Sequence, residues 1–263
     1  MKSAGRMQGR GRTWLLFIAA FALGLLLGRA LLPEPPSATG HAEEIARSVA
    51  LVWYQGEGGW THYGTAFSVD DEGRLLTCAH VVHGREAVTV AIPTPEGEKN
   101  VRAAVVAEDI SIDAAILQME EGRIPPVRFG ESGAVRVGEE IAFAGFPLGY
   151  TVSADLFPSV VMGHVSAVPE WRVHPEAPRI RMFHLDASVA IGHSGSPLIS
   201  RRTGKVIGMV KSHIHVPGPV VSTEDVLGEV ESIPEKMAAL TGIGIALPSD
   251  RLVAFLRENG IER

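Results

Sequence analysis

Residues 64–82, Gly64-Thr-Ala-Phe-Ser-Val-Asp-Asp-Glu-Gly-Arg-Leu-Leu-Thr-Cys-Ala-His-Val-Val82, contain two short apolar runs separated by a compact polar turn. The turn, Asp70-Asp-Glu-Gly73, carries the glycine that is typical of a β-hairpin connection. A histidine follows the second run directly. The stretch therefore predicts a hairpin that places His80 at the end of a strand.

The same pattern recurs along the chain, as short runs rich in valine, isoleucine and alanine that end at glycine, proline or paired acids. The 29 glycines and 17 prolines also favour many tight turns over a helical bundle. Strands are expected at 49–54, 64–69, 74–77, 87–92, 101–108, 114–119, 140–145, 159–168, 182–186, 197–200, 206–211 and 242–246. So many short strands predict an all-β protein built as barrels or a sandwich.

Helices are expected in two places in the body of the chain. Residues 43–50 are expected to form a short helix that leads into the first strand. The stretch from Ser249 to Gly260 has an apolar face, a capping residue in Ser249 or Asp250, and a glycine at its end.

Composition excludes several classes of protein. A hydrophobic content of 46% excludes a disordered chain, and the net charge of −6 gives no electrostatic reason to bind nucleic acid. The 6% of aromatic residues also argues against a base-stacking surface. The single cysteine excludes an internal disulfide and a multi-cysteine metal site.

The N-terminus has the pattern of a membrane segment. An uncharged run from Trp14 to Gly28 follows a basic start, so we expect a basic cytoplasmic tail at 1–12 and a transmembrane signal anchor at 13–32. Residues 33–46 are expected to form a proline-rich tether. This orientation predicts a single-pass protein of the cytoplasmic membrane with its body on the extracytoplasmic side. The alternative is a cleaved signal peptide and a secreted protein, although no Ala-x-Ala site directly follows the run.

Two strings carry side chains suited to nucleophilic catalysis. The first ends in His80, and the second is Gly192-His-Ser-Gly-Ser-Pro-Leu198, a serine between small residues. A serine nucleophile needs an exposed hydroxyl on a tight turn, with backbone N–H groups that converge on one point. It also needs a general base and a carboxylate that orients the base.

Several strings in this order resemble trypsin-like serine proteases, and the bacterial Deg/HtrA-type branch of the chymotrypsin fold is the most similar. The resemblance covers roughly residues 47–260. It rests on Gly64-Thr-Ala-Phe67, Thr77-Cys-Ala-His-Val-Val82, Asp113-Ala-Ala-Ile-Leu117, Gly145-Phe-Pro-Leu-Gly149, Gly192-His-Ser-Gly-Ser-Pro-Leu198, Val206-Ile-Gly-Met209 and Ile245-Ala-Leu-Pro-Ser249.

The resemblance implies two six-stranded antiparallel barrels, at about 47–136 and 137–247, and a C-terminal helix at 249–259. It implies a serine endopeptidase that cleaves proteins or peptides without a cofactor or metal. Deg-type proteins often carry a C-terminal PDZ domain, and none is expected here because the given sequence ends after the helix.

The resemblance also assigns roles within the site. Ser194 is the implied nucleophile, His80 the general base and Asp113 the residue that orients His80, with Asp109 as the alternative carboxylate. The backbone N–H groups of Gly192 and Ser194 are implied as the oxyanion hole.

The implied substrate pocket has uncharged walls, which favours small or medium apolar side chains before the scissile bond. Alternatively, Lys211 or His213 faces the pocket and recruits an acidic residue. The implied pocket residues are Ser188, Val189, Ile191, Val210 and Lys211.

Three residues depart from the usual pattern of these proteases. His193 stands where the Deg branch usually has asparagine, and Ser196 replaces a common glycine. Cys78 takes a position that is usually asparagine or alanine, and we expect it to be a small buried residue.

Two further features bear on function. His213-x-His215 has metal-ligand spacing along a strand, but no third ligand is evident. Residues 216–241 form an acidic insertion that we interpret as a regulatory or docking loop, or as a solvated spacer. The alternative to an enzyme is a catalytically silent protease fold that serves as a membrane-tethered binding module.

Overall fold

A computed structural model describes residues 38–56, 61–151, 155–171, 179–213 and 243–262. Its helices and 3-10 turns are α2 (Ala38–Ala46), α3 (Ala79–Val82), η2 (Ser132–Ala134), η3 (Gly149–Thr151) and α5 (Ser249–Glu258). Its first strands are β1 (Val49–Gln55), β2 (Thr61–Ser68), β3 (Arg74–Thr77), β4 (Ala87–Thr94), β5 (Gly97–Asp109) and β6 (Ala114–Met119). The later strands are β7 (Glu140–Gly145), β8 (Ser159–Ala167), β9 (Glu170–Trp171), β10 (Ile180–Arg181), β11 (Phe183–Leu185), β12 (Pro197–Ser200), β13 (Val206–His213) and β14 (Gly244–Pro248).

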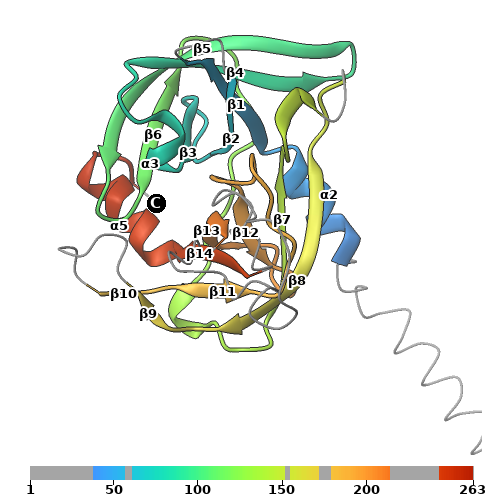
Figure 1. Ribbon diagram of the computed structural model, residues 1–263, viewed down its shortest axis with the longest axis vertical. Helices are drawn as coiled ribbons and strands as arrows, with labels where there is room; N and C mark the ends of the chain where they lie inside the picture. The colour runs from blue at the N-terminus through green and yellow to red at the C-terminus, as the bar shows by residue number, and fades with distance from the viewer. Residues whose placement is uncertain (1–37, 57–60, 152–154, 172–178, 214–242, 263) are drawn as a thin grey trace, which may run out of the picture. The chain divides into compact units, whose positions relative to one another are not determined.

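The strands close into two antiparallel barrels of six strands each (Figure 1). The first has the order β1-β2-β3-β6-β5-β4 and the second β11-β14-β13-β12-β7-β8. The hairpin predicted around Asp70–Gly73 pairs β2 with β3, so that Phe67 lies opposite Leu76. The prediction of two six-stranded barrels followed by a C-terminal helix is confirmed.

Each barrel is filled by apolar side chains of its strands. Leu51, Phe67 and Leu117 are fully buried in the first barrel, and Ile141 and Phe183 in the second. Burying one such side chain contributes about 1.5–3 kcal/mol, and this term favours closure of the strands around a dry interior. The core of the first barrel continues into buried residues of β12, β13 and β14, so the two barrels meet through apolar contacts.

The C-terminal helix differs from the prediction at its first turn. Neither Ser249 nor Asp250 caps it, because the residue before the helix is Pro248 and the Ser249 hydroxyl donates to the Gly130 carbonyl. The backbone N–H of Asp250 instead donates to the hydroxyl of Ser132 in η2, at 3.1 Å. Gly260, at φ +76°, follows the last turn as predicted.

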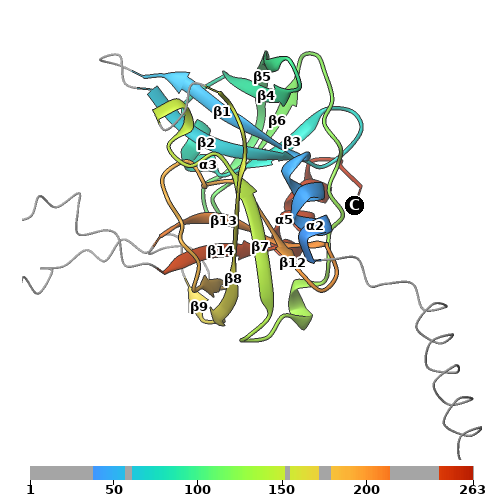
Figure 2. The same ribbon diagram turned by 90° about the vertical axis from the view of Figure 1, so that its right-hand side faces the viewer.

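The helix expected at 43–50 lies earlier in the chain. α2 ends at Ala46, and residues from Val49 onward already pair with β2. Ala42 and Ile45 are buried, and α2 lies beside β7 (Figure 2). Tertiary packing of these two side chains therefore decides the bounds of a helix that is weak in isolation.

Within the described residues, none of the helices has the length and apolar character needed to cross a membrane. The predicted anchor at 13–32 and the acidic insertion at 216–241 lie outside the described residues.

Candidate active site

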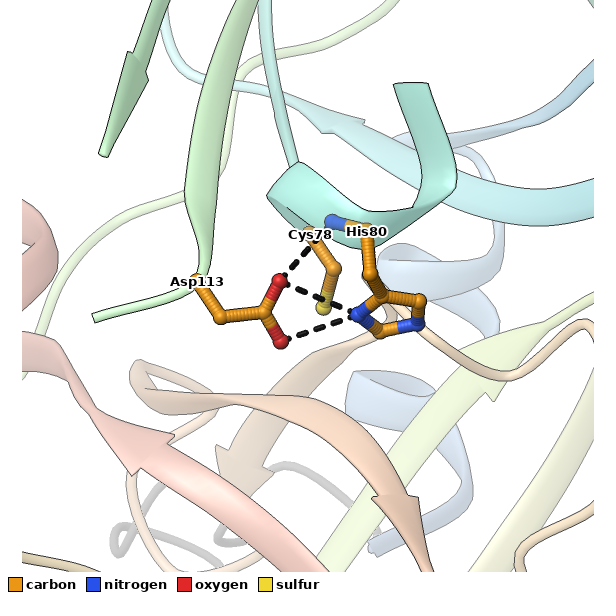
Figure 3. A group of neighbouring side chains, drawn as sticks. All are labelled: Cys78, His80 and Asp113. Carbon is orange, nitrogen blue, oxygen red and sulfur yellow. Dashed lines mark hydrogen bonds and ion pairs between the residues drawn. The ribbon is translucent and has the colours of Figure 1, made fainter. Parts of the chain in front are cut away.

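His80 lies in the single helical turn α3, directly after β3, and its imidazole faces Asp113 (Figure 3). Its Nδ1 is 3.0 Å from Asp113 Oδ1 and 2.9 Å from Oδ2. The backbone N–H of His80 also donates to Oδ1, at 2.9 Å. The carboxylate therefore fixes both the ring and the turn that carries it, and about half of the His80 side chain stays exposed.

Asp113 occupies the turn between β5 and β6 with φ +60°, a left-handed conformation that costs about 1–2 kcal/mol in a non-glycine residue. The side chain is 11% exposed. Burial opposes its charge, but hydrogen bonds and charge interactions with His80 and Lys211 outweigh burial and lower the pKa of Asp113. Asp113 is thus held as a carboxylate beside the imidazole.

Asp109, the alternative carboxylate, has a different partner. Its Oδ1 accepts hydrogen bonds from the backbone N–H and the hydroxyl of Ser111, at 2.8 and 2.6 Å. These bonds stabilise the turn that leads to Asp113. The structure therefore pairs His80 with Asp113 and gives Asp109 a local role in the turn.

Ser194 lies in the loop between β11 and β12, and two glycines with positive φ flank it, Gly192 at +97° and Gly195 at +91°. A Cβ on Gly195 would lie 1.9 Å from the Thr65 carbonyl oxygen, and one on Gly192 would lie 2.2 Å from the Phe146 carbonyl oxygen. Both positions therefore exclude any side chain. The glycines let the serine loop pass against the backbone of β2 and of the segment after β7.

The Ser194 hydroxyl donates a hydrogen bond to the backbone carbonyl of Lys211 in β13. Within the part of the chain that the structure describes, it makes no hydrogen bond to His80. The backbone N–H groups of Gly192 and Ser194 likewise have no acceptor among the described residues. Two free N–H groups beside a serine are the donors that an oxyanion requires.

His193, between these two residues, is directed away from them into the second barrel. Its side chain packs edge-on against Phe143, with ring centroids 5.2 Å apart, and its Nδ1 accepts a hydrogen bond from the backbone N–H of Ala190 at 3.0 Å. Burial lowers the pKa of His193 to about 4, so the ring is neutral at neutral pH. Ser196 is also fully buried and packs against Gly145.

The residues of the implied pocket differ in exposure. Val189 and Val210 are buried, whereas Ser188 and Ile191 are exposed. The Lys211 side chain is directed at Asp113, and its Nζ lies 3.1 Å from Asp113 Oδ2. Sequence reasoning missed this contact. The sequence feature that could have indicated this contact is the single cation in the otherwise apolar run 206–211, because a buried lysine requires an acidic partner.

Cys78 is fully buried beside His80 and Asp113, as expected for a small apolar residue, and its thiol donates to the Val210 carbonyl at 3.5 Å. Burial and the nearby charge of Asp113 raise the pKa of the thiol well above its ordinary value. The ligand atoms of these three residues lie within 4.8 Å of one another. A metal cation does not fit this group, because the thiol stays protonated and the Lys211 ammonium already occupies the carboxylate.

Comparisons with known proteins identify the family of this chain. A family model of the trypsin-like peptidase domain matches residues 64–209. A probable periplasmic serine endoprotease DegP-like of Halomonas elongata is 30% identical over 178 residues, which cover 68% of this chain and 32% of that protein. A serine protease HtrA-like of Staphylococcus haemolyticus is 29% identical over 203 residues, covering 70% of this chain and 30% of that protein.

The chain thus spans about a third of the length of these curated relatives. Among solved structures, the HtrA-type protease AlgW with a tripeptide has a TM-score of 0.65 and 23% sequence identity, and the match covers 86% of this chain and 65% of that chain. This similarity supports the double-barrel fold. The family model covers more than half of the chain, and on that basis the protein belongs to the trypsin-like peptidase domain family, with HtrA and DegP proteases among its homologues.

Proposed function

We propose that this protein is a serine endopeptidase in which Ser194 is the nucleophile, His80 the general base and Asp113 the residue that orients the base. The observation that carries the proposal is the contact of His80 Nδ1 with both carboxylate oxygens of Asp113, at 3.0 and 2.9 Å. This contact holds the proton on Nδ1 and leaves Nε2 free to accept one from a serine hydroxyl.

We infer the following steps for the reaction. The Ser194 hydroxyl first breaks its hydrogen bond to the Lys211 carbonyl. It then transfers its proton to His80 Nε2 while its oxygen bonds to the scissile carbonyl carbon. The N–H groups of Gly192 and Ser194 stabilise the negative charge on the carbonyl oxygen. His80 then protonates the leaving amine, and water hydrolyses the acyl-enzyme by the same steps.

A serine-reactive fluorophosphonate probe tests this proposal. The full chain should be labelled and should hydrolyse unfolded protein, and Ser194→Ala should abolish both. His80→Ala should lower kcat by several orders of magnitude, and the double variant should be little worse, because the three residues act as a unit. Additive losses in the double variant would contradict the triad.

A specific observation favours a second candidate, a catalytically silent binding module. The Ser194 hydroxyl is bonded to the Lys211 carbonyl and is therefore not activated by His80 in this arrangement. A folded protein that neither reacts with the probe nor cleaves peptides, yet still binds them, would favour this candidate.

We also propose that residues 13–32 anchor the protein in the cytoplasmic membrane, with the protease domain on the extracytoplasmic side. The cations Lys2, Arg6, Arg10 and Arg12 precede the apolar run, which favours a cytoplasmic N-terminus. The Halomonas relative is described as periplasmic, in agreement with this side of the membrane. A reporter fused after Arg263 that works only in the cytoplasm would contradict the proposal, and release of a form processed near residues 37–42 would favour a cleaved signal peptide.

A further inference from the structure

Lys211 is a buried cation that directly follows the apolar run 206–210 of β13. Its neighbours Met209 and Val210 are fully buried, and the Lys211 side chain is only 10% exposed. The ammonium lies 3.1 Å from Asp113 Oδ2 and 3.4 Å from the Ile112 carbonyl oxygen. A lysine in the second barrel therefore reaches across to the turn that carries the carboxylate in the first.

Asp113 consequently has two partners that compete for one negative charge. Oδ2 faces both His80 Nδ1, at 2.9 Å, and Lys211 Nζ, at 3.1 Å. Cys78 is the remaining titratable group in contact with this cluster among the described residues, and its thiol is uncharged because burial raises its pKa. The charge balance at the base is therefore determined by Asp113, His80 and Lys211.

We infer that Lys211 is a positioning residue of the catalytic centre, one that anchors Asp113 and withdraws part of its negative charge from His80. This inference rests on the proposed function of the triad. A positive charge near the imidazole disfavours a second positive charge on the ring, and it also weakens the attraction between the ring and Asp113. His80 therefore stays unprotonated, and able to act as a base, at a lower pH than it would beside Asp113 alone.

The size of the effect follows from the distances. The protonated His80 ring and the Lys211 ammonium would both contact one carboxylate oxygen at about 3 Å, so the two positive charges would lie several ångströms apart. Because the site is partly exposed, an effective dielectric constant of about 20 applies. Allowing for screening at the half-exposed ring, we expect removal of the lysine charge to move the acid limb of kcat/KM upward by about one pH unit.

The test compares pH profiles of kcat/KM for the full chain and three variants. Lys211→Met removes the charge and keeps most of the length of the side chain, Lys211→Arg keeps the charge, and Lys205→Met removes an exposed lysine just before the same strand. The acid limb should move upward by about one unit in Lys211→Met and stay in place in the other two. An unchanged acid limb in Lys211→Met, or a fall in the plateau alone, would overturn the inference and leave Lys211 with a structural role.

A second variant and a second measurement cover the cases in which a variant does not fold or does not react. If Lys211→Met does not fold, Lys211→Gln should show the same upward shift, and an unshifted limb in that variant would count equally against the inference. If no variant reacts with the fluorophosphonate probe, the proposed function fails by itself. The protonation midpoint of the His80 imidazole, followed by NMR in Ser194→Ala with and without Lys211→Met, then decides: a higher midpoint without the lysine supports the inference, and an equal midpoint overturns it.

Discussion

The hydroxyl of Thr65, in β2 of the first barrel, donates a 2.7 Å hydrogen bond to the carbonyl oxygen of Gly192, in the serine loop of the second. The same oxygen atom of Thr65 accepts a hydrogen bond from the backbone N–H of Phe146, at 3.1 Å, and the Thr65 backbone N–H donates to the Ser194 carbonyl, at 2.8 Å. One buried threonine thus joins the two barrels at the loop that carries the serine. It orients the peptide plane next to the proposed oxyanion donors.

Thr65→Val should therefore destabilise the fold and impair catalysis together. Valine has nearly the same shape, but it leaves the Gly192 carbonyl and the Phe146 N–H buried without partners, at a cost of about 1–3 kcal/mol for each. We expect kcat to fall more than KM rises, since the loop and its oxyanion donors lose their support. Denaturant unfolding and peptide kinetics check this result, and Thr61→Val, in the less buried end of the same strand, should change neither quantity appreciably.

Gly195→Ala should be among the most damaging single substitutions in the chain. The new methyl group would lie 1.9 Å from the Thr65 carbonyl oxygen, so the barrels would have to separate at the site. We expect a loss of more than about 4 kcal/mol, or no soluble folded protein. Gly138→Ala is the matched control, because Gly138 has φ +88° with no atom within 4 Å of the added group, and only the backbone cost of about 1–2 kcal/mol applies. Similar stabilities for the two variants would contradict this account of the serine loop.

As the pH is lowered, His193 should begin to decrease the free energy of unfolding at a higher pH than the carboxylates do. Its pKa is lowered by burial from 6.5 to about 4, so the unfolded chain takes up a proton in this interval that the folded protein excludes. The contribution of His193 to stability is complete above about pH 6.5, falls as the pH decreases, and is gone below about pH 4, a total of about 3 kcal/mol.

His193→Asn should remove this loss, because the amide oxygen can accept the Ala190 N–H and does not titrate. Unfolding free energies at pH 7, 5.5 and 4.5 give the comparison. The pKa of His184 is also lowered by burial, but that residue is common to both proteins and cancels in the difference. Parallel stability curves for the two proteins would show that His193 is not the group responsible.

Cleavage should favour small or medium apolar residues before the scissile bond. Val189 and Val210 are buried and uncharged, and the Lys211 ammonium is paired with Asp113, so it has no free charge to offer an acidic side chain. Ser188→Asp should increase the rate of cleavage after arginine and lysine by about tenfold or more. This is the gain expected from one charge-assisted hydrogen bond. Profiling both proteins with a peptide library measures this, and a strong preference of the unmodified protein for glutamate, arginine or lysine would contradict the pocket.

The acidic insertion at 216–241 should affect activity or substrate range if it is a regulatory or docking loop. Replacing residues 217–236 with a short Gly/Ser link removes all five of its acids and all three of its prolines while keeping β13 and β14 connected. We expect the variant to fold and to differ in cleavage rate or substrate profile, because the insertion follows the strand that lines the proposed pocket. An unchanged rate and profile in a stable variant would leave the spacer interpretation.

The sequence by itself determined the local elements and the residues of the candidate site. The strands at 74–77, 114–119, 140–145 and 197–200 have the predicted bounds, because short apolar runs between turn residues have few other ways to bury their side chains. The strings around His80, Asp113 and Ser194 were also recognisable, since glycines and small residues are needed wherever a backbone turns tightly near a reacting group.

Only the tertiary structure decided which groups meet. It paired His80 with Asp113 and used Asp109 to stabilise the turn, although both carboxylates lie in one acidic stretch. It also directed Lys211 away from the pocket and against Asp113. The energy of such a contact depends on the closure of both barrels, because a buried charge is stable only where a distant part of the chain delivers the opposite one.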